Sequence, residues 1–411
     1  MTQHISRLAR VLAATALLLG PATSLQPVEA ATARPLPGAI ITLPGAPPLY
    51  LAEPFTYTDS GPTLLFSDQP EYVEGEGILS RGTFSGPWRV FVYHVNQETS
   101  GYKYFPVVIR NLGEKEVTVT VRRQGVRGPS QSYLWVGQES LRDFFLPQQP
   151  RTLKIPAGGW ALLDPTGLKR PVTYNQLIEG LYEGDTDGPI EMLVLATNSL
   201  EDIDLARFEP IPVPADKVNR GTFGPADRTI NLANAGEEAV WLLASGKYYD
   251  QFLTGPDELD GNMRSNFGNY GVVYHVNLRL RAPAESTEAE ARAEVGAEAE
   301  AEAVAVAVAA ENATGTTKTE TSTGRKVRIY FGSGSGCGFA GAILVTAGPN
   351  AGKVIRIPET PRRYFSGYGA DMSYVAEIEL NSNEETLFSF DFMPPGASCL
   401  PALLYVLPVK D

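Results

Sequence analysis

One stretch of the chain, Val117-Thr-Val-Thr-Val-Arg122, decides the fold class by its strict alternation of apolar and polar residues. Alternate residues of a β-strand point to opposite faces, so the pattern predicts a half-buried strand with its valines inward. The chain also holds 40 Gly and 32 Pro, which favour frequent turns between short strands. We therefore predict an all-β protein built from β-sandwich-like domains.

Further strands are expected on both sides of this stretch, marked by β-branched and aromatic residues. Before residue 208 the expected strands are 63–66, 88–95, 104–111, 117–122, 152–155, 160–163 and 191–196. After residue 214 they are 229–232, 239–244, 271–280, 327–331, 342–346, 354–357, 374–380, 386–390 and 402–407.

One short helix is predicted within the first half of the chain. Ser130 or Ser132 would cap it, and one side would carry Tyr133, Val136, Ser140 and Phe144. Gly137 argues against this helix, because Gly in a helix interior costs up to about 1 kcal/mol relative to Ala.

Two β-sandwich domains are predicted, spanning residues 50–207 and 215–411, with a Pro-rich linker at 208–214. Residues 31–49 form a Pro-rich leader that we expect to be extended and poorly ordered. Residues 283–324 are rich in Ala and Glu and have no apolar face to bury, so we interpret them as a disordered acidic loop insertion. The sequence Arg-Gly-Thr-Phe occurs at 81–84 and 220–223, and Tyr-His-Val-Asn at 93–96 and 274–277, which indicates either duplication or shared strand chemistry.

The N-terminus has the pattern of a secretory signal peptide over residues 1–30. Arg7 and Arg10 precede a short apolar run at 11–19, and small residues follow at 28–33. The run is too short to span a bilayer, so cleavage is favoured over a retained anchor. We expect a secreted, extracellular protein, associated with the cell wall or released, with no membrane span after cleavage.

Cys337 and Cys399 are the only two cysteines of the chain. Export would place them where disulfides persist, so a bridge is favoured over free thiols. It would close a loop of 62 residues, which stabilises a fold by roughly 3–4 kcal/mol in the chain-entropy model.

The formal net charge of −13 argues against a nucleic-acid partner, because the phosphate backbone requires a basic face. Eight glutamates and one arginine between residues 285 and 311 carry much of this charge. The acidity therefore indicates a solvated segment rather than a specific partner.

Two histidines follow the signal peptide, His94 and His275, and they are the first candidates for a metal or catalytic site. Catalytic zinc normally takes three protein ligands, and neither histidine has an acid or cysteine at ligand spacing. We predict hydrogen-bonded or surface strand histidines. The G-x-G-x-x-G match at 336–341 is followed by an expected strand rather than a helix, so no dinucleotide site and no cofactor is predicted.

A weak calcium candidate is formed by Glu183, Asp185 and Asp187, which alternate as in a calcium loop. The position that requires a glutamate is Val194, so a turn at Asp187-Gly188 is favoured over a metal site.

Tyrosines near Gly, Asn and Asp are the residues with a functional alternative. Exposed rings stack on sugars, and the candidates for ligand contacts are Tyr248, Tyr249, Tyr364, Tyr368 and Tyr374. The competing interpretation is that these rings cover the edges of the core, which is their common location.

Several short motifs resemble a family of secreted, β-rich surface proteins of Gram-positive bacteria. They are Ser67-Asp-Gln-Pro-Glu-Tyr72, Gly77-Ile-Leu79, Tyr93-His-Val-Asn96, the stretch from Gly125 to Ser130, Arg220-Gly-Thr-Phe-Gly-Pro-Ala-Asp-Arg228 and Asn266-Phe-Gly-Asn-Tyr-Gly271. Members are often labelled copper amine oxidase-like. That activity needs three histidine ligands and a tyrosine within T-x-x-N-Y-(D/E), and the stretch at 266–271 lacks both the Thr and the acid. The resemblance therefore implies a surface protein and not this oxidase.

The most consistent functional hypothesis is a non-catalytic structural or adhesive protein of the cell surface, with no catalytic residues assigned. Its partner would be a cell-wall polymer, a glycan or a surface protein. A carbohydrate-binding module for cell-wall or environmental polysaccharide is the alternative. A secreted hydrolase is a further alternative, and it would require carboxyl groups that converge in a cleft.

Overall fold

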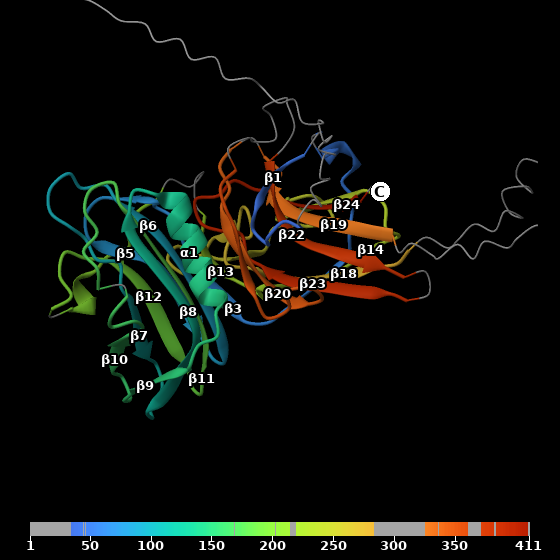
Figure 1. Cartoon of the computed structure of the whole chain (residues 1–411). Helices are drawn as coiled ribbons and strands as arrows, with labels where there is room; N and C mark the ends of the chain where they lie inside the picture. Colours follow the sequence, from blue (N-terminus) through green and yellow to red (C-terminus); the bar gives the residue numbers. More distant parts are fainter. Residues whose placement is uncertain are drawn as a thin grey trace, which may run out of the picture. The chain divides into compact units, whose positions relative to one another are not determined.

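The computed structural model describes residues 34–409, apart from 44, 46, 168, 202, 214–218, 283–324, 336, 361–370 and 382–383. The predicted signal peptide and acidic insertion lie outside the described residues. Strands dominate the described part of the chain, and they pack as sandwiches (Figure 1). The predicted all-β, sandwich-like fold class is confirmed.

The first sandwich consists of a four-stranded and a seven-stranded sheet. The four-stranded sheet has the order β10 (Trp160–Leu162), β7 (Val107–Asn111), β12 (Ile190–Ala196) and β5 (Gly77–Phe84). The seven-stranded sheet has the order β13 (Arg220–Phe223), β3 (Thr63–Ser67), β6 (Pro87–Asn96), β11 (Leu177–Thr186), β8 (Val117–Ser130) and β9 (Arg151–Ile155), with β4 (Tyr72–Val73) paired to β6. Val117, Val119 and Val121 of β8 are buried in the core between the two sheets, as their alternation predicts.

The second sandwich consists of a five-stranded and a six-stranded sheet. The five-stranded sheet has the order β1 (Ile40–Thr42), β22 (Asp371–Leu380), β19 (Arg325–Ser333), β24 (Ala402–Pro408) and β15 (Ala239–Leu243). The six-stranded sheet has the order β2 (Tyr57–Ser60), β14 (Asp227–Asn234), β18 (Val273–Leu280), β23 (Thr386–Phe392), β20 (Gly341–Ala347) and β21 (Val354–Ile357). Trp241, Phe331 and Phe390 fill the core between these sheets.

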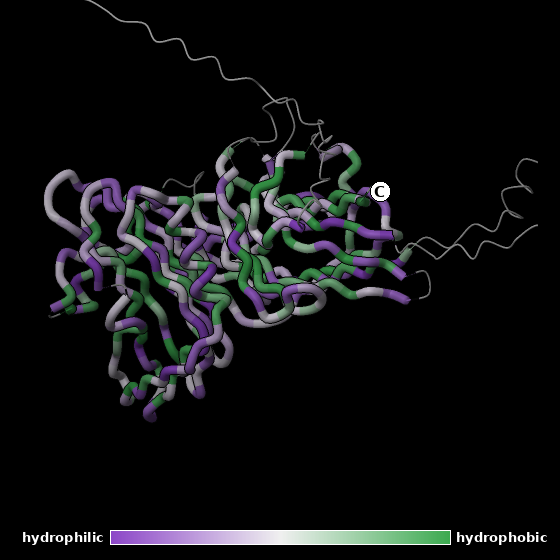
Figure 2. Tube along the Cα trace, in the orientation of Figure 1, coloured by the Kyte–Doolittle hydropathy of each residue, from purple (hydrophilic) through white to green (hydrophobic). Residues whose placement is uncertain are grey.

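Short elements complete the described chain. They are a hairpin of β16 (Thr254–Pro256) and β17 (Met263–Ser265), and the 3₁₀ turns η1 (Leu49–Leu51) and η2 (Leu205–Arg207). Figure 2 shows apolar residues gathered on the strands inside the sandwiches and hydrophilic residues along many outer turns. This distribution follows from the removal of apolar surface from water.

Part of the predicted leader is a strand. β1 pairs antiparallel with β22, with Ile40 opposite Ser373, and Leu43 is buried. The expectation of a poorly ordered leader was therefore wrong for residues 40–43, because main-chain hydrogen bonds and apolar burial hold them in place.

The predicted domain boundary at 208–214 stays a prediction. β2 precedes it in the sequence and pairs with β14, which follows it. β13 follows the boundary and pairs with β3, which precedes it. The sheets therefore combine strands from both sides of the predicted linker.

The predicted helix is present as α1 (Tyr133–Phe145) and begins after Ser132, whose side chain makes no capping hydrogen bond. Val136, Ser140 and Phe144 are buried, as their spacing predicts. The helix packs against β8 and β11 on one side and against β20 and β21 on the other (Figure 1). It therefore lies between a sheet of the first sandwich and a sheet of the second.

The loop before β24 approaches α1 closely. A Cβ at Gly137 would overlap the carbonyl oxygen of Gly396, so the absence of a side chain lets the loop backbone rest on the helix. Cys337 and Cys399 form the predicted disulfide, with their Cα atoms 5.8 Å apart. The helix and the disulfide together fix the position of residues 396–399.

A buried arginine joins the two sandwiches. Arg89 of β6 donates to the carbonyl oxygens of Ala226 and Gly271, at 2.7 and 3.0 Å, both close to strands of the second sandwich. It also pairs with Glu183 of β11 and with Asp227 of β14. This buried network therefore stabilises the contact between the two sandwiches. Side chains from β6 and the loop at 396–399 face one another at this contact.

Candidate ligand-binding site

Of the predicted tyrosine contacts, the three that the structure describes do not form one surface. Tyr248 is 78% exposed and stands perpendicular to half-buried Tyr249, at an interplanar angle of 85°. Tyr374 is buried in the core, and Tyr364 and Tyr368 lie outside the described residues. Among the described tyrosines, Tyr248 and Tyr249 line an open groove of about 720 Å³ together with Phe55 and Tyr57.

The three calcium candidates are engaged with protein groups. The partners are Arg89 and Arg123 for Glu183, Arg122 for Asp185, and the backbone N–H of Thr118 for Asp187. The turn at 187–188 connects β11 to β12, which lie in different sheets and do not pair as a hairpin. Within the described parts of the chain, no group of three or more His, Cys, Asp or Glu residues is placed to hold a metal ion.

His94 lies fully buried in β6. Its ring nitrogens contact Ser67 Oγ and the carbonyl oxygen of Pro70, each at 2.9 Å. Burial lowers the pKa of His94 to about 3, so the imidazole is neutral at physiological pH. A neutral ring that donates to a carbonyl and accepts from a hydroxyl is a satisfied core histidine.

His275 of β18 lies between two carboxylates. Its Nε2 is 3.8 Å from Asp227, and its Nδ1 is 2.7 Å from Asp391. These carboxylates raise the pKa of His275 to about 9, so the imidazole is charged at neutral pH. Asp227 also pairs with Arg89, which makes His275 a member of the network that joins the sandwiches.

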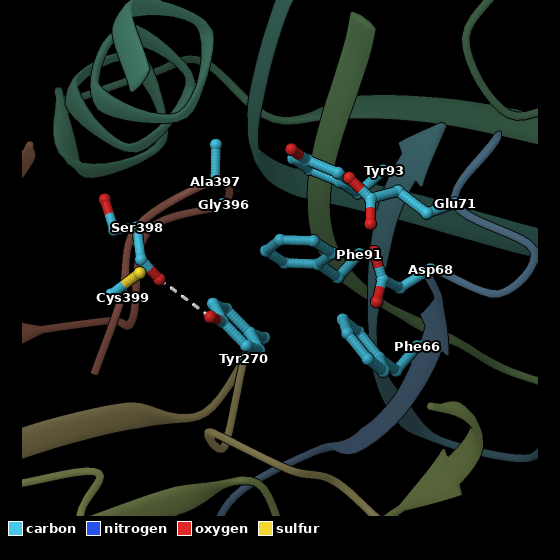
Figure 3. Close-up of a pocket in the computed structure, with 10 residues that line it drawn as sticks. All are labelled: Phe66, Asp68, Glu71, Phe91, Tyr93, Tyr270, Gly396, Ala397, Ser398 and Cys399. Atoms are coloured by element: carbon cyan, nitrogen blue, oxygen red, sulfur yellow. Dashed lines mark hydrogen bonds between the residues drawn. The ribbon is translucent and has the colours of Figure 1, made fainter. Parts of the chain in front are cut away.

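A cavity of about 230 Å³ lies beside this network, between β3, β6 and the loop before β24. Its aromatic lining comes from Phe66 of β3, Phe91 and Tyr93 of β6, and Tyr270 from the loop before β18. Residues 396–399 form the opposite wall (Figure 3). The cavity is therefore lined by elements whose positions the helix and the disulfide fix.

Two carboxyl groups line this cavity, and a third lies behind its lining. Asp68 follows β3 and Glu71 precedes β4, and Figure 3 shows both on the same wall. Burial, and next the Glu71 carboxylate, raises the pKa of Asp68 to about 8. Burial also raises the pKa of Glu71. Carboxyl groups that crowd together in a poorly solvated site hold their protons more tightly.

Glu179 of β11 is the third carboxyl group and is fully buried. Its strand position is opposite Tyr93, and a Cβ at Gly396 would overlap one of its carboxylate oxygens, so the group lies directly behind two residues that line the cavity. Burial, and next Asp68, raises the pKa of Glu179 to about 8. Neither of its oxygens has a hydrogen-bond partner among the described residues.

The Tyr270 phenol interacts electrostatically with all three carboxyl groups. Burial, and then Asp68, Glu71 and Glu179, raises the pKa of the Tyr270 phenol. The Tyr270 hydroxyl donates to the carbonyl oxygen of Ser398 at 2.8 Å, and its ring lies parallel to that of Phe66. The phenol therefore bridges the cavity to the disulfide-bound loop.

Sequence analysis did not single out the three carboxyl groups as a site. Asp68 and Glu71 stand within the stretch that carries the resemblance, and the available signal is a pair of acids directly after an apolar strand. Glu179 lies in β11, a strand that the periodicity did not predict. The chain segments meet only through the pairing of β3, β6 and β11.

No protein-family profile matches the chain, and no curated protein matches it in sequence. None of the described helices is both long and apolar enough to cross a bilayer.

Proposed function

We propose that this chain is a secreted, non-catalytic binding protein of the cell exterior, and that it holds a component of the cell surface in the acidic aromatic cavity. The cavity combines aromatic walls with a few polar groups, which is the composition that ligand-binding sites commonly have. The N-terminal pattern 1–30 and the disulfide support export.

The observation that carries this proposal is the unsatisfied Glu179. A buried carboxyl group without a hydrogen bond is costly, because it loses its hydration and gains nothing in return. At Glu179 this cost falls beside a cavity large enough for a small chemical group. A ligand that gave Glu179 a hydrogen bond or an ion pair would recover part of this free-energy cost.

Hydrolysis is the competing interpretation, because carboxyl groups converge at the cavity. Glycoside hydrolysis uses one protonated and one ionised carboxyl group. Here burial favours the protonated form of both Asp68 and Glu179, and no described Lys or Arg pairs with either one. This fully buried pair therefore lacks an ionised base, and Glu71, whose pKa is also raised by burial, is the remaining candidate for that role. We favour binding over catalysis on this ground.

Glycan binding is supported by a separate feature, the open groove at Tyr248 and Tyr249. Exposed aromatic rings can stack on sugar faces while their hydroxyls stay hydrated. The perpendicular arrangement of these two rings offers one stacking face rather than a flat platform.

The test is a pull-down of the chain without residues 1–30 on purified bacterial cell wall and on soluble glycans. Four proteins are compared: the parent, the double variant Asp68→Asn/Glu71→Gln, Tyr248→Ala, and Asp185→Asn as control. Asp185 is a half-buried acid on β11 away from the cavity lining, so the control removes a charge without altering the proposed site.

We expect the parent, Tyr248→Ala and Asp185→Asn to bind alike and the double variant to bind at least about tenfold more weakly. Loss of binding in Tyr248→Ala alone would assign the ligand to the groove and overturn the cavity proposal. If none of the four proteins is retained on the cell wall, a binding role at the wall is contradicted. Cleavage of a wall polymer or glycan by the parent, abolished in the double variant, would establish a hydrolase instead.

A further inference from the structure

The aromatic lining of the cavity is suited to a positive charge. Phe66, Phe91, Tyr93 and Tyr270 present four rings to the same space. The faces of such rings carry a negative quadrupole, which attracts cations within about 6 Å of the ring centre. The ring centroid of Phe66 lies 5.1 Å from that of Phe91 and 6.1 Å from that of Tyr270, so these rings form one aromatic group at the cavity.

The carboxyl groups of the cavity have no positive counterpart in the described chain. Asp68, Glu71 and Glu179 form no ion pair with a described Lys, Arg or His residue. Arg127 of β8 lies opposite Glu179, but its guanidinium pairs with Asp143 of α1. Gln69 and Asn219 hydrogen-bond to Asp68, and Tyr72 to Glu71, whereas Glu179 has no such partner among the described residues. The site therefore offers acidic groups without an ion-pair partner beside aromatic rings.

Both features point to the same ligand chemistry, and we propose that the cavity binds an organic ammonium group, with the ammonium beside Asp68 and Glu71 and within electrostatic reach of Glu179. This inference rests on the proposed binding function and specifies its ligand class. The ammonium would contact the aromatic rings and would compensate the buried carboxyl groups.

Two other ligand classes fit the cavity less well. Calcium takes six to eight oxygen ligands, whereas most of this lining is aromatic. A neutral sugar could accept hydrogen bonds from protonated carboxyl groups, but it would bring no positive charge to the faces of the four rings. An ammonium group satisfies the rings and the carboxyl groups together.

Ammonium binding should be linked to protons. Near neutral pH Asp68 and Glu179 hold their protons, and a cation would favour the ionised forms. The other titratable groups at this site are Glu71, Tyr93, Tyr270 and Tyr72, which hydrogen-bonds to Glu71. All three phenols have pKa values raised by burial and by the carboxyl groups. Affinity for a permanent cation should therefore increase from about pH 6 to about pH 9, as protons leave the carboxyl groups.

The experiment is isothermal titration of the chain without residues 1–30 with choline and with its neutral analogue, in which a quaternary carbon replaces the nitrogen. Butylammonium and butanol form a second matched pair without the methyl groups. Phosphate buffer is used because amine buffers would compete. The variants are Glu71→Gln and Glu179→Gln, with Asp185→Asn as control, and thermal unfolding checks that each one folds.

We expect at least one ammonium compound to bind about tenfold or more tightly than its neutral analogue. The preference should fall in Glu71→Gln and Glu179→Gln, persist in Asp185→Asn, and grow with pH. Glu71 is only partly buried, so its variant should fold even if Glu179→Gln does not.

Equal affinity for the charged and neutral compounds, or no binding of either ammonium compound, would overturn the ammonium inference. Carboxyl-dependent binding of calcium chloride without ammonium binding would also overturn it. Each of these results leaves the proposed function standing if cell-wall retention still depends on Asp68 and Glu71. Loss of that dependence would reject the proposed function itself.

Discussion

Arg89 and Glu179 are both fully buried charged residues on adjacent strands of one sheet, but their surroundings differ. Arg89 makes hydrogen bonds to two carbonyl oxygens and to the carboxylates of Glu183 and Asp227. Glu179 has no hydrogen-bond partner among the described residues. The charge of Arg89 is therefore compensated by other groups of the chain, whereas the carboxyl group of Glu179 has no such partner among the described residues.

Other buried arginines follow the compensated pattern. Arg228 pairs with Asp59 and Asp250 and lies over the ring of Tyr57 at 3.8 Å. Arg220 pairs with Asp257 at 2.8 Å. The buried arginines therefore have carboxylate partners within the fold, as expected of charges that serve packing. Glu179 has no such partner among the described residues, which makes it a better candidate for a functional group than these arginines.

The largest expected effect is the removal of a compensated charge. Arg89→Met should lower the free energy of unfolding by about 3–5 kcal/mol, because it leaves Glu183 and Asp227 without their buried partner. Urea denaturation followed by circular dichroism measures the change. Arg122→Gln is the control, since Arg122 is exposed and its pair with Asp185 should contribute less than about 1 kcal/mol. Equal losses in the two variants would contradict a structural role specific to Arg89.

The next effect concerns the uncompensated charge and appears as a pH dependence. The folded-state pKa of Glu179 is raised to about 8, above its value in the unfolded chain, so its ionisation destabilises the fold as pH rises. Glu179→Gln removes this ionisation. Relative to the parent, the variant should gain about 2–3 kcal/mol in unfolding free energy between about pH 5 and pH 8.

Urea denaturation of parent and Glu179→Gln across this pH range measures that gain. Asp185→Asn should follow the parent, because Asp185 is only half-buried and pairs with the exposed Arg122. A difference between Glu179→Gln and the parent that does not change with pH would show that Glu179 is already compensated in solution.

The comparison also explains what could be predicted from the sequence. The alternation at 117–122 predicted β8, because a strand with one buried face carries a period of two. β11, the strand beside it, was missed because both of its faces are buried and it contains Gly180, Glu179 and Glu183, which break the apolar pattern. Gly184 is required in β11, since a Cβ there would overlap the carbonyl oxygen of Thr120.

The site was beyond sequence reasoning for a related reason. The disulfide could be predicted, because two cysteines in an exported chain have one possible pairing. The cavity could not, because Asp68, Glu179 and Gly396 come from distant parts of the chain and meet only through sheet pairing and loop packing. Glu183 illustrates the ambiguity: an acid that alternates as in a calcium loop is paired with two arginines.

A smaller effect is expected where the loop meets Glu179. Gly396→Ala should destabilise the fold by about 1–2 kcal/mol, because the added Cβ would overlap a Glu179 carboxylate oxygen and lie 2.8 Å from the Tyr93 ring. The double variant Gly396→Ala/Glu179→Ala should cost less than the sum of the two single changes. Strict additivity in thermal or urea denaturation would show that the loop does not rest against Glu179.

The smallest effect tests the compensated network at its partly exposed edge. Asp227 and Asp391 raise the pKa of His275 to about 9, so its charged form stabilises the fold. That contribution is fully present below about pH 6.5 and is lost as pH rises toward 9. His275 is 36% exposed at its side chain, so solvent screening should hold the contribution below about 1 kcal/mol.

His275→Gln should therefore reduce stability slightly at about pH 6 and match the parent at about pH 10, whereas His94→Gln should cost the same at both, because His94 stays neutral throughout. The Glu179 window begins near pH 5 and overlaps that of His275 up to about pH 8. The two variants His275→Gln and Glu179→Gln, compared over this range, therefore separate a group that the fold compensates from one that it leaves to a ligand.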